Sequence, residues 1–228
     1  MTKKVFVEKE QLEGIVQQYP TPFHLYDEKG IRENARKLNA AFSWNKGFKE
    51  YFAVKATPTP AILQILKEEG CGVDCSTYTE LMMADALGFK GDEIMFSSNV
   101  TPKEDFQFAR KLNATINLDD ITHIDFLEEA AGLPETVSCR FNPGGEFTIN
   151  NEIMDKPEDA KYGFIRPQLT EGFKKLMAKG VKHFGLHSFL ASNNVADEYY
   201  PILAGILFQT AVELKEETGA DITFINLS

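Results

Sequence analysis

Short apolar runs alternate with longer amphipathic stretches along this sequence, and that alternation limits the folds open to it. The apolar runs have the length of buried strands, and the stretches between them repeat apolar residues with a helical period. Strands that alternate with helices predict βαβ units and a parallel sheet. The predicted strands are Tyr51–Val54, Gly72–Cys75, Ile94–Ser97, Ala114–Leu118, Val137–Phe141, His183–His187 and Ile222–Leu227. The predicted helices are Thr59–Glu69, Thr77–Leu87, Lys103–Leu112, Ile121–Ala131, Leu169–Ala178 and Asp197–Thr218.

Seven strands in 228 residues fit either a doubly wound sheet or a (β/α)8 barrel. No glycine-rich fingerprint follows the first strand, which weakens the doubly wound alternative. A TIM-type barrel carries its functional residues at the C-terminal ends of its strands. The polar and aromatic residues found at such ends are Lys55, Asp74, Ser76, Arg140, Asn142, His187 and Phe189. The pattern therefore favours an α/β barrel over residues 47–228, with residues 1–46 as a segment that leads into it.

A closed barrel of this type has eight strands, and the last residues of the chain, 222–228, have the pattern of a strand end. We therefore expect the N-terminal part of a longer protein, with the barrel truncated before its last strand. An open barrel exposes unpaired strand edges, at which a second copy could pair.

Composition excludes several classes of partner. The net charge is −10, and no run of Lys and Arg forms a basic stripe, so neither nucleic acid nor an anionic membrane is expected to bind. We find no signal peptide and no apolar run of membrane-spanning length, which predicts a cytoplasmic protein. The three cysteines, Cys71, Cys75 and Cys139, are expected to be free buried thiols, and no metal site is predicted.

Lys55 closes the first predicted strand, at the rim of the expected core. Desolvation there would lower the pKa of its ammonium, and a neutral amine is the form that attacks a carbonyl and makes a Schiff base. Considered alone, a lysine at a strand end is better explained by a side chain that reaches out to solvent.

The stretch YFAVKA, residues 51–56, resembles the Schiff-base lysine motif of the pyridoxal phosphate-dependent decarboxylases with the alanine-racemase-like fold. This group includes the diaminopimelate, ornithine and arginine decarboxylases. The resemblance implies that Lys55 is catalytic and holds pyridoxal phosphate (PLP) covalently.

Two further segments continue the resemblance in order. The segment GVDCSTYTEL, residues 72–81, is similar to the second-strand motif of the family, in which Asp74 and Glu80 are the matching positions. Glu80 is also explained as part of a capping box with Ser76 or Thr77. The segment VSCRFNPG, residues 137–144, resembles the family's RxNPG, and implies that Arg140 belongs to a network beneath the cofactor.

The segment GLHSFLAS, residues 185–192, resembles the family's GxHxHxGS, but Phe189 replaces the second histidine and Ala191 replaces the glycine. In the family that histidine stacks on the cofactor ring, and phenylalanine also offers a flat apolar face. Ser192 holds the place of the phosphate-binding serine. His187 keeps the first histidine as a cofactor-site residue, and its role stays open.

The resemblance implies PLP-dependent decarboxylation. RxNPG together with KYGF, residues 161–164, favours the diaminopimelate branch, which converts meso-diaminopimelate to L-lysine in lysine biosynthesis. The alternatives are decarboxylation of another basic amino acid or of carboxynorspermidine, a non-catalytic PLP-binding barrel, and a Schiff-base aldolase without PLP. The family's glycine-rich phosphate loop and its C-terminal β-domain are absent. Without them the 228-residue chain is expected to be inactive by itself. The resemblance also implies that the full protein is a homodimer, because the family's β-domain contributes residues across the dimer interface.

Overall fold

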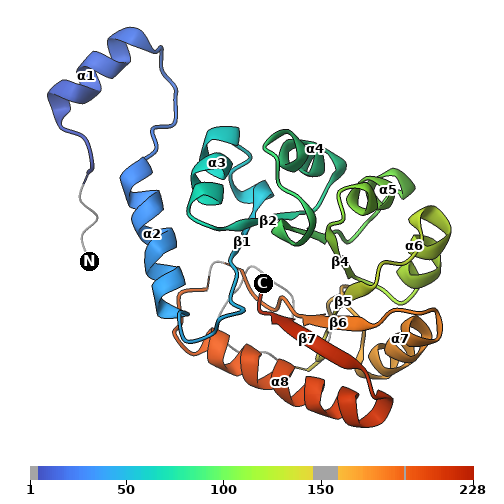
Figure 1. Cartoon of the computed structure of the whole chain (residues 1–228). Helices are drawn as coiled ribbons and strands as arrows, with labels where there is room; N and C mark the ends of the chain where they lie inside the picture. The colour runs from blue at the N-terminus through green and yellow to red at the C-terminus, as the bar shows by residue number, and fades with distance from the viewer. Residues whose placement is uncertain (1–4, 146–158, 193) are drawn as a thin grey trace.

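The structure is a computed structural model that describes residues 5–145, 159–192 and 194–228. Its centre is one curved sheet of seven parallel strands, hydrogen-bonded in chain order (Figure 1). All seven predicted strands are confirmed, with bounds shifted by one residue at most. They are β1 (Tyr51–Ala53), β2 (Gly72–Cys75), β3 (Ile94–Ser97), β4 (Thr115–Leu118), β5 (Thr136–Arg140), β6 (His183–His187) and β7 (Asp221–Asn226).

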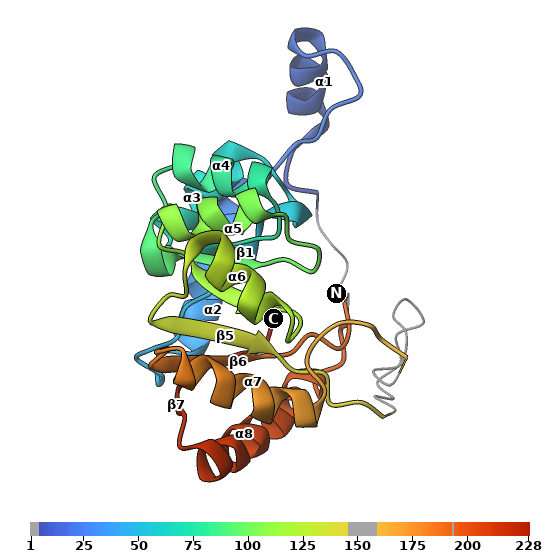
Figure 2. The ribbon, with the colours of Figure 1, turned by 90° about the vertical axis from the view of Figure 1, so that its right-hand side faces the viewer.

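The six predicted helices are also confirmed, and they cover the outer face of the sheet (Figure 2). They are α3 (Pro60–Glu68), α4 (Tyr78–Ala86), α5 (Lys103–Lys111), α6 (His123–Ala131), α7 (Arg166–Ala178) and α8 (Tyr199–Thr218). The capping explanation of Glu80 is confirmed at the start of α4. Its carboxylate accepts the backbone N–H of Ser76, while the Thr77 hydroxyl accepts the N–H of Glu80.

Two helices precede the sheet, in a segment where the sequence pattern predicted no element. The first, α1 (Lys9–Gln18), has no buried residue and projects from the rest of the molecule (Figures 1 and 2). The second, α2 (Glu28–Ala41), packs on α3, where Ala35 joins Ile62, Leu66 and Cys71 in a small hydrophobic cluster. Only α2 of the two is therefore tied to the sheet by packing.

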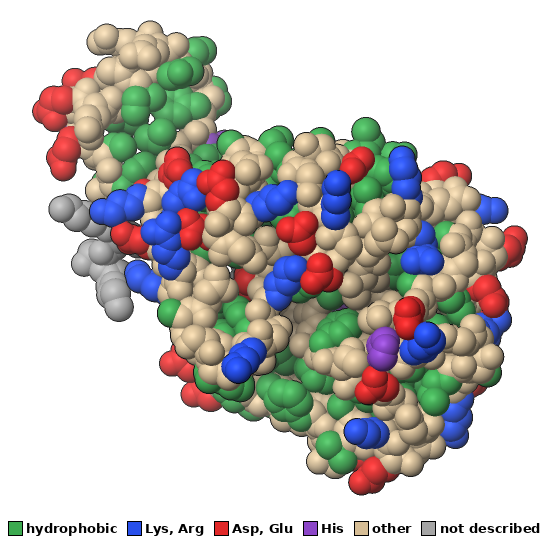
Figure 3. All heavy atoms as spheres, in the orientation of Figure 1, with side chains coloured by type: hydrophobic (Ala, Val, Ile, Leu, Met, Phe, Trp, Pro, Cys, Tyr) green, Lys and Arg blue, Asp and Glu red, His purple; other side chains and the backbone are tan. Residues whose placement is uncertain are grey.

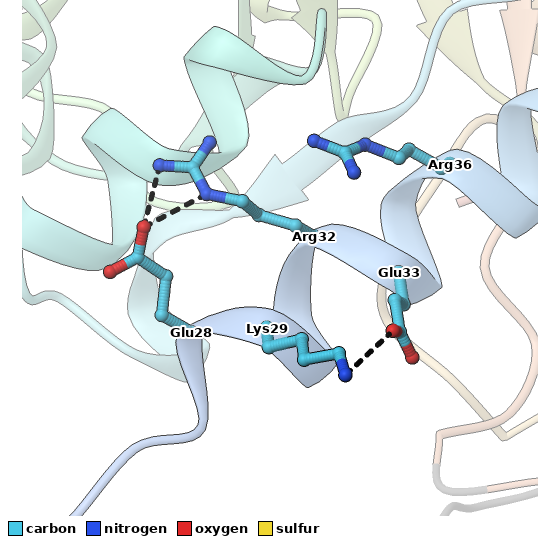
Figure 4. Close-up of a pocket in the computed structure, with 5 residues that line it drawn as sticks. All are labelled: Glu28, Lys29, Arg32, Glu33 and Arg36. Atoms are coloured by element: carbon cyan, nitrogen blue, oxygen red, sulfur yellow. Dashed lines mark hydrogen bonds and ion pairs between the residues drawn. The ribbon is translucent and has the colours of Figure 1, made fainter.

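Salt bridges add to the contact between α2 and α3. Arg32 reaches both Glu68 and Glu69, and Arg36 pairs with Glu69. Figure 4 shows a hollow on this surface, in which Glu28 pairs with Arg32 and Lys29 with Glu33. The fifth residue that lines the hollow, Arg36, pairs with Glu69 of α3, so every charged group there has a partner and we assign the hollow a structural role.

The two faces of the sheet differ in polarity. Alternate residues of a strand point to opposite faces, and the outward set packs under the helices as a continuous core. Its members are each at most 1% exposed: Val73, Cys75, Ile94, Phe96, Ile116, Leu118, Val137, Cys139, Phe184 and Leu186. The inward set includes Asp74, Ser97, Asn117, Ser138, Arg140 and His187. The polar side chains of the strands therefore lie mostly on the inner face of the curved sheet.

The sheet curves into a barrel that stays open between β1 and β7, which do not pair within the described residues. The predicted seven-stranded incomplete barrel of (β/α)8 type is thus confirmed.

Across the face shown in Figure 3, acidic and basic side chains are interspersed, with no patch of one sign. No helix in the part of the chain that the structure describes is both long and apolar enough to cross a membrane.

Candidate functional site

Four of the predicted site residues lie close to the C-terminal ends of four strands. Lys55 follows β1, Asp74 is in β2, Arg140 ends β5 and His187 ends β6. The register pairs Ala53 with Asp74 and Arg140 with His187. Because all the strands are parallel, these ends meet at one rim of the barrel.

Lys55 stands above this rim and not within the core. The chain leaves β1 at Ala53 and enters a short 3-10 turn, η1 (Val54–Ala56), which lifts Lys55 beyond the strand end. Lys55 is exposed, so the desolvation that we expected for its amine is not supplied by the described residues. Among those residues it has no ion-pair or hydrogen-bond partner, which leaves the amine accessible to a ligand.

Asp74 is a buried carboxyl group that interacts electrostatically with Lys55. Burial raises the pKa of Asp74 to about 7, although Ser97 and the charge of Lys55 act in the opposite direction. Its Oδ1 atom is buried and has no hydrogen-bond partner in the described part of the chain. At neutral pH this carboxyl group is therefore able both to hold and to release a proton.

His187 is a neutral imidazole on the same rim. Its Nδ1 lies 3.1 Å from Nδ2 of Asn117, which as an amide donor places the ring proton on Nε2. Burial lowers the pKa of His187 to about 3, and the positive charges of Arg140 and Lys55 act in the same direction. The ring is thus available as a neutral hydrogen-bond donor through Nε2.

Arg140 is the centre of a buried network. Its Nη1 donates to Oδ1 of Asp119 at 3.1 Å, and Nδ2 of Asn99 donates to the same oxygen at 2.8 Å. Its Nη2 donates to the backbone oxygen of Phe189 at 3.3 Å. The guanidinium also lies over two rings, 5.2 Å from the centroid of Tyr162 and 5.7 Å from that of Phe189. Arg140 therefore joins β5 to the segment after β4 and to the loop after β6.

The loop after β6 carries the last two predicted residues. Phe189 is partly buried beside Arg140, and Ser192 is also partly buried. The loop's backbone is tied to α8, because the N–H groups of Leu190 and Ala191 donate to the hydroxyl oxygen of Tyr199. The structure thus brings Lys55, Asp74, Arg140, His187 and Phe189 to one rim, and Ser192 follows Phe189 in the loop after β6.

The sequence pattern did not identify several members of this site: Asn99, Asn117, Asp119, Ser138 and Tyr162. A signal was present in the fourth strand, where Thr115, Asn117 and Asp119 alternate with apolar residues. A parallel strand covered on both faces is normally apolar throughout, so polar residues at every second position indicate a polar interior.

The interior has unused hydrogen-bonding capacity. Within the described residues, buried Asp74 Oδ1, Asn117 Oδ1 and Ser138 Oγ have no partner. Buried polar atoms without a partner are rare, and they indicate a place for a bound polar molecule. An accessible amine, unpartnered oxygens and the flat ring of Phe189 together fit PLP, a flat and polar aldehyde that bonds to lysine. No cluster of His, Cys, Asp or Glu in the described ranges is arranged to hold a metal ion.

Comparison with known proteins gives one family match. Residues 28–227 match the family described as pyridoxal-dependent decarboxylase, pyridoxal binding domain. The matched range begins at α2 and includes every strand of the sheet.

Individual relatives agree with this match. The chain is 35% identical over 217 residues to protein TabA of Pseudomonas amygdali pv. tabaci, covering 95% of this chain and 50% of TabA. It is 30% identical over 213 residues to diaminopimelate decarboxylase of Methanothermobacter thermautotrophicus, covering 93% of this chain and 50% of that enzyme. The chain therefore spans about half the length of the curated relatives it matches.

Solved structures show the same fold. Diaminopimelate decarboxylase of M. jannaschii in complex with L-lysine superposes with a TM-score of 0.82 at 25% identity, over 94% of this chain and 52% of that one. Lysine decarboxylase of Selenomonas ruminantium superposes with a TM-score of 0.81 at 19% identity, over 98% of this chain and 56% of that one.

Proposed function

This chain belongs to the pyridoxal-dependent decarboxylases, whose pyridoxal-binding domain it matches, and on that basis we propose that it holds PLP in a decarboxylase of meso-diaminopimelate that forms L-lysine. The prediction of PLP as the cofactor is confirmed at the level of the family. The observation that carries the proposal is Lys55, an accessible amine that interacts electrostatically with Asp74 at the rim where functional residues of such barrels lie.

In this proposal Nζ of Lys55 would hold the cofactor covalently at its aldehyde carbon, and this attachment would release a water molecule and a proton of the ammonium. The carboxylate of Asp74 is suited to receive that proton at neutral pH, because burial raises its pKa to about 7. His187 stays neutral and donates from Nε2 to a ligand oxygen. Phe189 supplies a flat apolar face for the ring, and Ser192 a hydroxyl for the phosphate. The bound cofactor supplies the electron sink that makes loss of a carboxylate from an amino acid feasible.

In this proposal Arg140 has a structural role and takes no part in the reaction. Its charge is already paired with Asp119, and both side chains are largely buried, at 11% and 8% exposed. Removing one partner of such a pair leaves an uncompensated buried charge. Arg140 therefore holds the carbonyl of Phe189 and keeps the rim in place.

The choice of meso-diaminopimelate is supported by the names of the relatives in Methanothermobacter thermautotrophicus and Thermoplasma acidophilum. A decarboxylase of another basic amino acid is the second candidate, since the fold is shared with a lysine decarboxylase and TabA carries no substrate in its name. We further propose that the full-length protein is a cytoplasmic homodimer, and that the 228-residue chain binds PLP without turning substrate over.

The decisive experiment is an absorption titration of the chain with PLP. We expect a visible band from the lysine-bound cofactor in the wild type and in Lys103→Ala, a matched control at an exposed lysine of α5. Lys55→Ala should lack the band. A band that persists in Lys55→Ala would contradict the proposed attachment.

The substrate is tested on the same samples and on a chain extended beyond Ser228. Release of carbon dioxide is measured with meso-diaminopimelate and with L-lysine. Release from L-lysine alone would replace the proposed substrate by the second candidate. Release from meso-diaminopimelate by the unextended chain would contradict the expectation that it is inactive.

A further inference from the structure

The loop between β6 and α8 carries two of the predicted cofactor-binding residues, Phe189 and Ser192, on a buried backbone. Ser188, Leu190 and Ala191 are 0%, 8% and 7% exposed. Backbone N–H groups that are shielded from water need acceptors inside the protein. A loop with no regular secondary structure must obtain many of these acceptors from side chains.

Tyr199 supplies the acceptor. It is the first residue of α8, is 2% exposed, and its hydroxyl oxygen accepts the N–H of Leu190 at 3.3 Å and that of Ala191 at 3.2 Å. Phe189, which precedes Leu190 in the loop, is held by a different side chain, because Arg140 donates to its carbonyl oxygen. Two side chains from different elements thus clamp three consecutive residues of the loop.

We infer that Tyr199 is a positioning residue for PLP, whose phenol oxygen fixes the loop that presents Phe189 and Ser192 to the cofactor. This inference rests on the proposed function. Tyr199 need not touch the cofactor, because it acts through the backbone of the loop. Its role differs from those of Lys55 and Asp74, which lie at the β1–β2 end of the sheet.

The ring of Tyr199 also packs in the hydrophobic core, and the effect of this packing must be separated from that of the hydroxyl oxygen. Tyr199 is part of the main hydrophobic core, and its ring meets that of Tyr200 edge-on with centroids 4.9 Å apart. Tyr199→Phe keeps this packing and removes only the oxygen. The neighbouring Tyr200 is exposed, so Tyr200→Phe is a matched control that removes a hydroxyl without touching the loop.

Without the oxygen, two adjacent buried N–H groups have lost their acceptor. Leaving such donors unsatisfied is unfavourable, so the free protein should move the loop until water reaches these amides. Cofactor binding then requires the loop to return, and the apparent affinity falls with the population of the competent loop. We expect the Kd for PLP to rise about tenfold in Tyr199→Phe and to stay unchanged in Tyr200→Phe.

The experiment has two readouts on the wild type and both variants. Hydrogen exchange followed by mass spectrometry, on the cofactor-free chain, should show faster exchange in the peptide that contains residues 188–192 of Tyr199→Phe. Peptides from β2 to β5 should keep wild-type exchange, which separates loop release from global unfolding. Titration with PLP, followed by the absorption band that depends on Lys55, gives the Kd.

The outcomes separate this inference from the function on which it rests. If the wild type shows no Lys55-dependent band, the proposed function fails and the inference falls with it. If the wild type binds PLP and Tyr199→Phe binds with the same Kd, the inference alone is overturned, whatever the exchange shows. Faster exchange confined to the loop together with a higher Kd supports it.

Discussion

At the scale of single residues, the site shows how one physical cause moves two pKa values in opposite directions. Burial raises the pKa of Asp74 and lowers that of His187, because a low-dielectric environment disfavours the charged form of either group. The positive charge of Lys55 opposes the first shift and reinforces the second. Between about pH 3 and pH 7 burial therefore keeps both groups neutral.

The shifted carboxyl group makes a stability prediction. The pKa of Asp74 is about 7 in the folded chain and 3.8 as its ordinary value, so the folded state binds the extra proton between these limits. The stabilising contribution of the Asp74 carboxyl group is complete below pH 3.8 and is lost as the pH rises through 7. Over this range its loss lowers the free energy of unfolding by at most about 4 kcal/mol. Asp74→Asn mimics the neutral acid, so it should be more stable than the wild type at pH 8 and equally stable at pH 4, measured by urea unfolding.

His187 contributes to the stability of the folded chain with the opposite pH dependence. Its pKa is about 3 when folded and 6.5 ordinarily, so its contribution is complete above pH 6.5 and is lost as the pH falls toward 3. In the wild type, the pH dependences of stability that come from Asp74 and His187 oppose each other between pH 4 and 6.5. In Asp74→Asn stability should therefore rise over this range, whereas the control Asp85→Asn, at an exposed position of α4, should behave as the wild type. An Asp74→Asn profile that follows the wild type would refute the assignment.

At the scale of elements, the polar interior depends on close approaches between strands. Gly72 opens β2 where a Cβ atom would lie 2.7 Å from the backbone oxygen of Glu93 and 2.8 Å from the ring of Tyr51. A backbone oxygen cannot move aside without shifting β3. Glycine at this position therefore sets how closely β1, β2 and the start of β3 approach one another.

This close approach gives a prediction about substitution by alanine. Gly72→Ala should destabilise the chain by about 1–3 kcal/mol, the usual range for overpacking. Gly205→Ala, in the middle of α8 with nothing within 4 Å of the added carbon, should stabilise it by about 0.5–1 kcal/mol. Urea unfolding of the two variants tests the pair. Equal effects of both would show that strand spacing at Gly72 has no role.

At the scale of the whole molecule, the N-terminal helices differ in how they are attached. The first, α1, buries none of its residues, whereas α2 buries Ala35 against α3 and forms salt bridges with it. The proposed boundary at residue 46 places both helices outside the barrel domain. The packing of α2 predicts that the two will respond differently to deletion.

Deletion of residues 1–26, which keeps the N-cap Asp27 of α2, should leave the urea midpoint within experimental error of the full chain, because no buried contact of α1 is lost. Deletion of residues 1–46 exposes Ile62 and Leu66, which are 7% and 8% exposed in the full chain, and removes the partners of Glu69. We expect its midpoint to fall clearly. Equal midpoints for the two deletions would support residue 46 as the boundary of an independent domain.

Sequence pattern was sufficient to predict the order of the strands and of the helices between them, because period-2 and period-3.6 patterns are local properties of the chain. It also indicated the rim residues Lys55, Asp74, Arg140 and His187, since parallel strands bring their ends together whatever their exact spacing. The N-terminal helices were missed: α1 buries no residue, and the one buried residue of α2 is Ala35, which packs against residues from 62 to 71.

Which side chains meet became visible only in the folded chain. The pairing of Asn117 with His187, the bond from Arg140 to the carbonyl of Phe189, and the acceptance of two amides by Tyr199 join residues whose contact depends on strand register and loop path. The fold also places Lys55 above the rim in η1, where local pattern had suggested a desolvated strand end. Register and burial arise from packing between distant segments, and for that reason no local pattern encodes them.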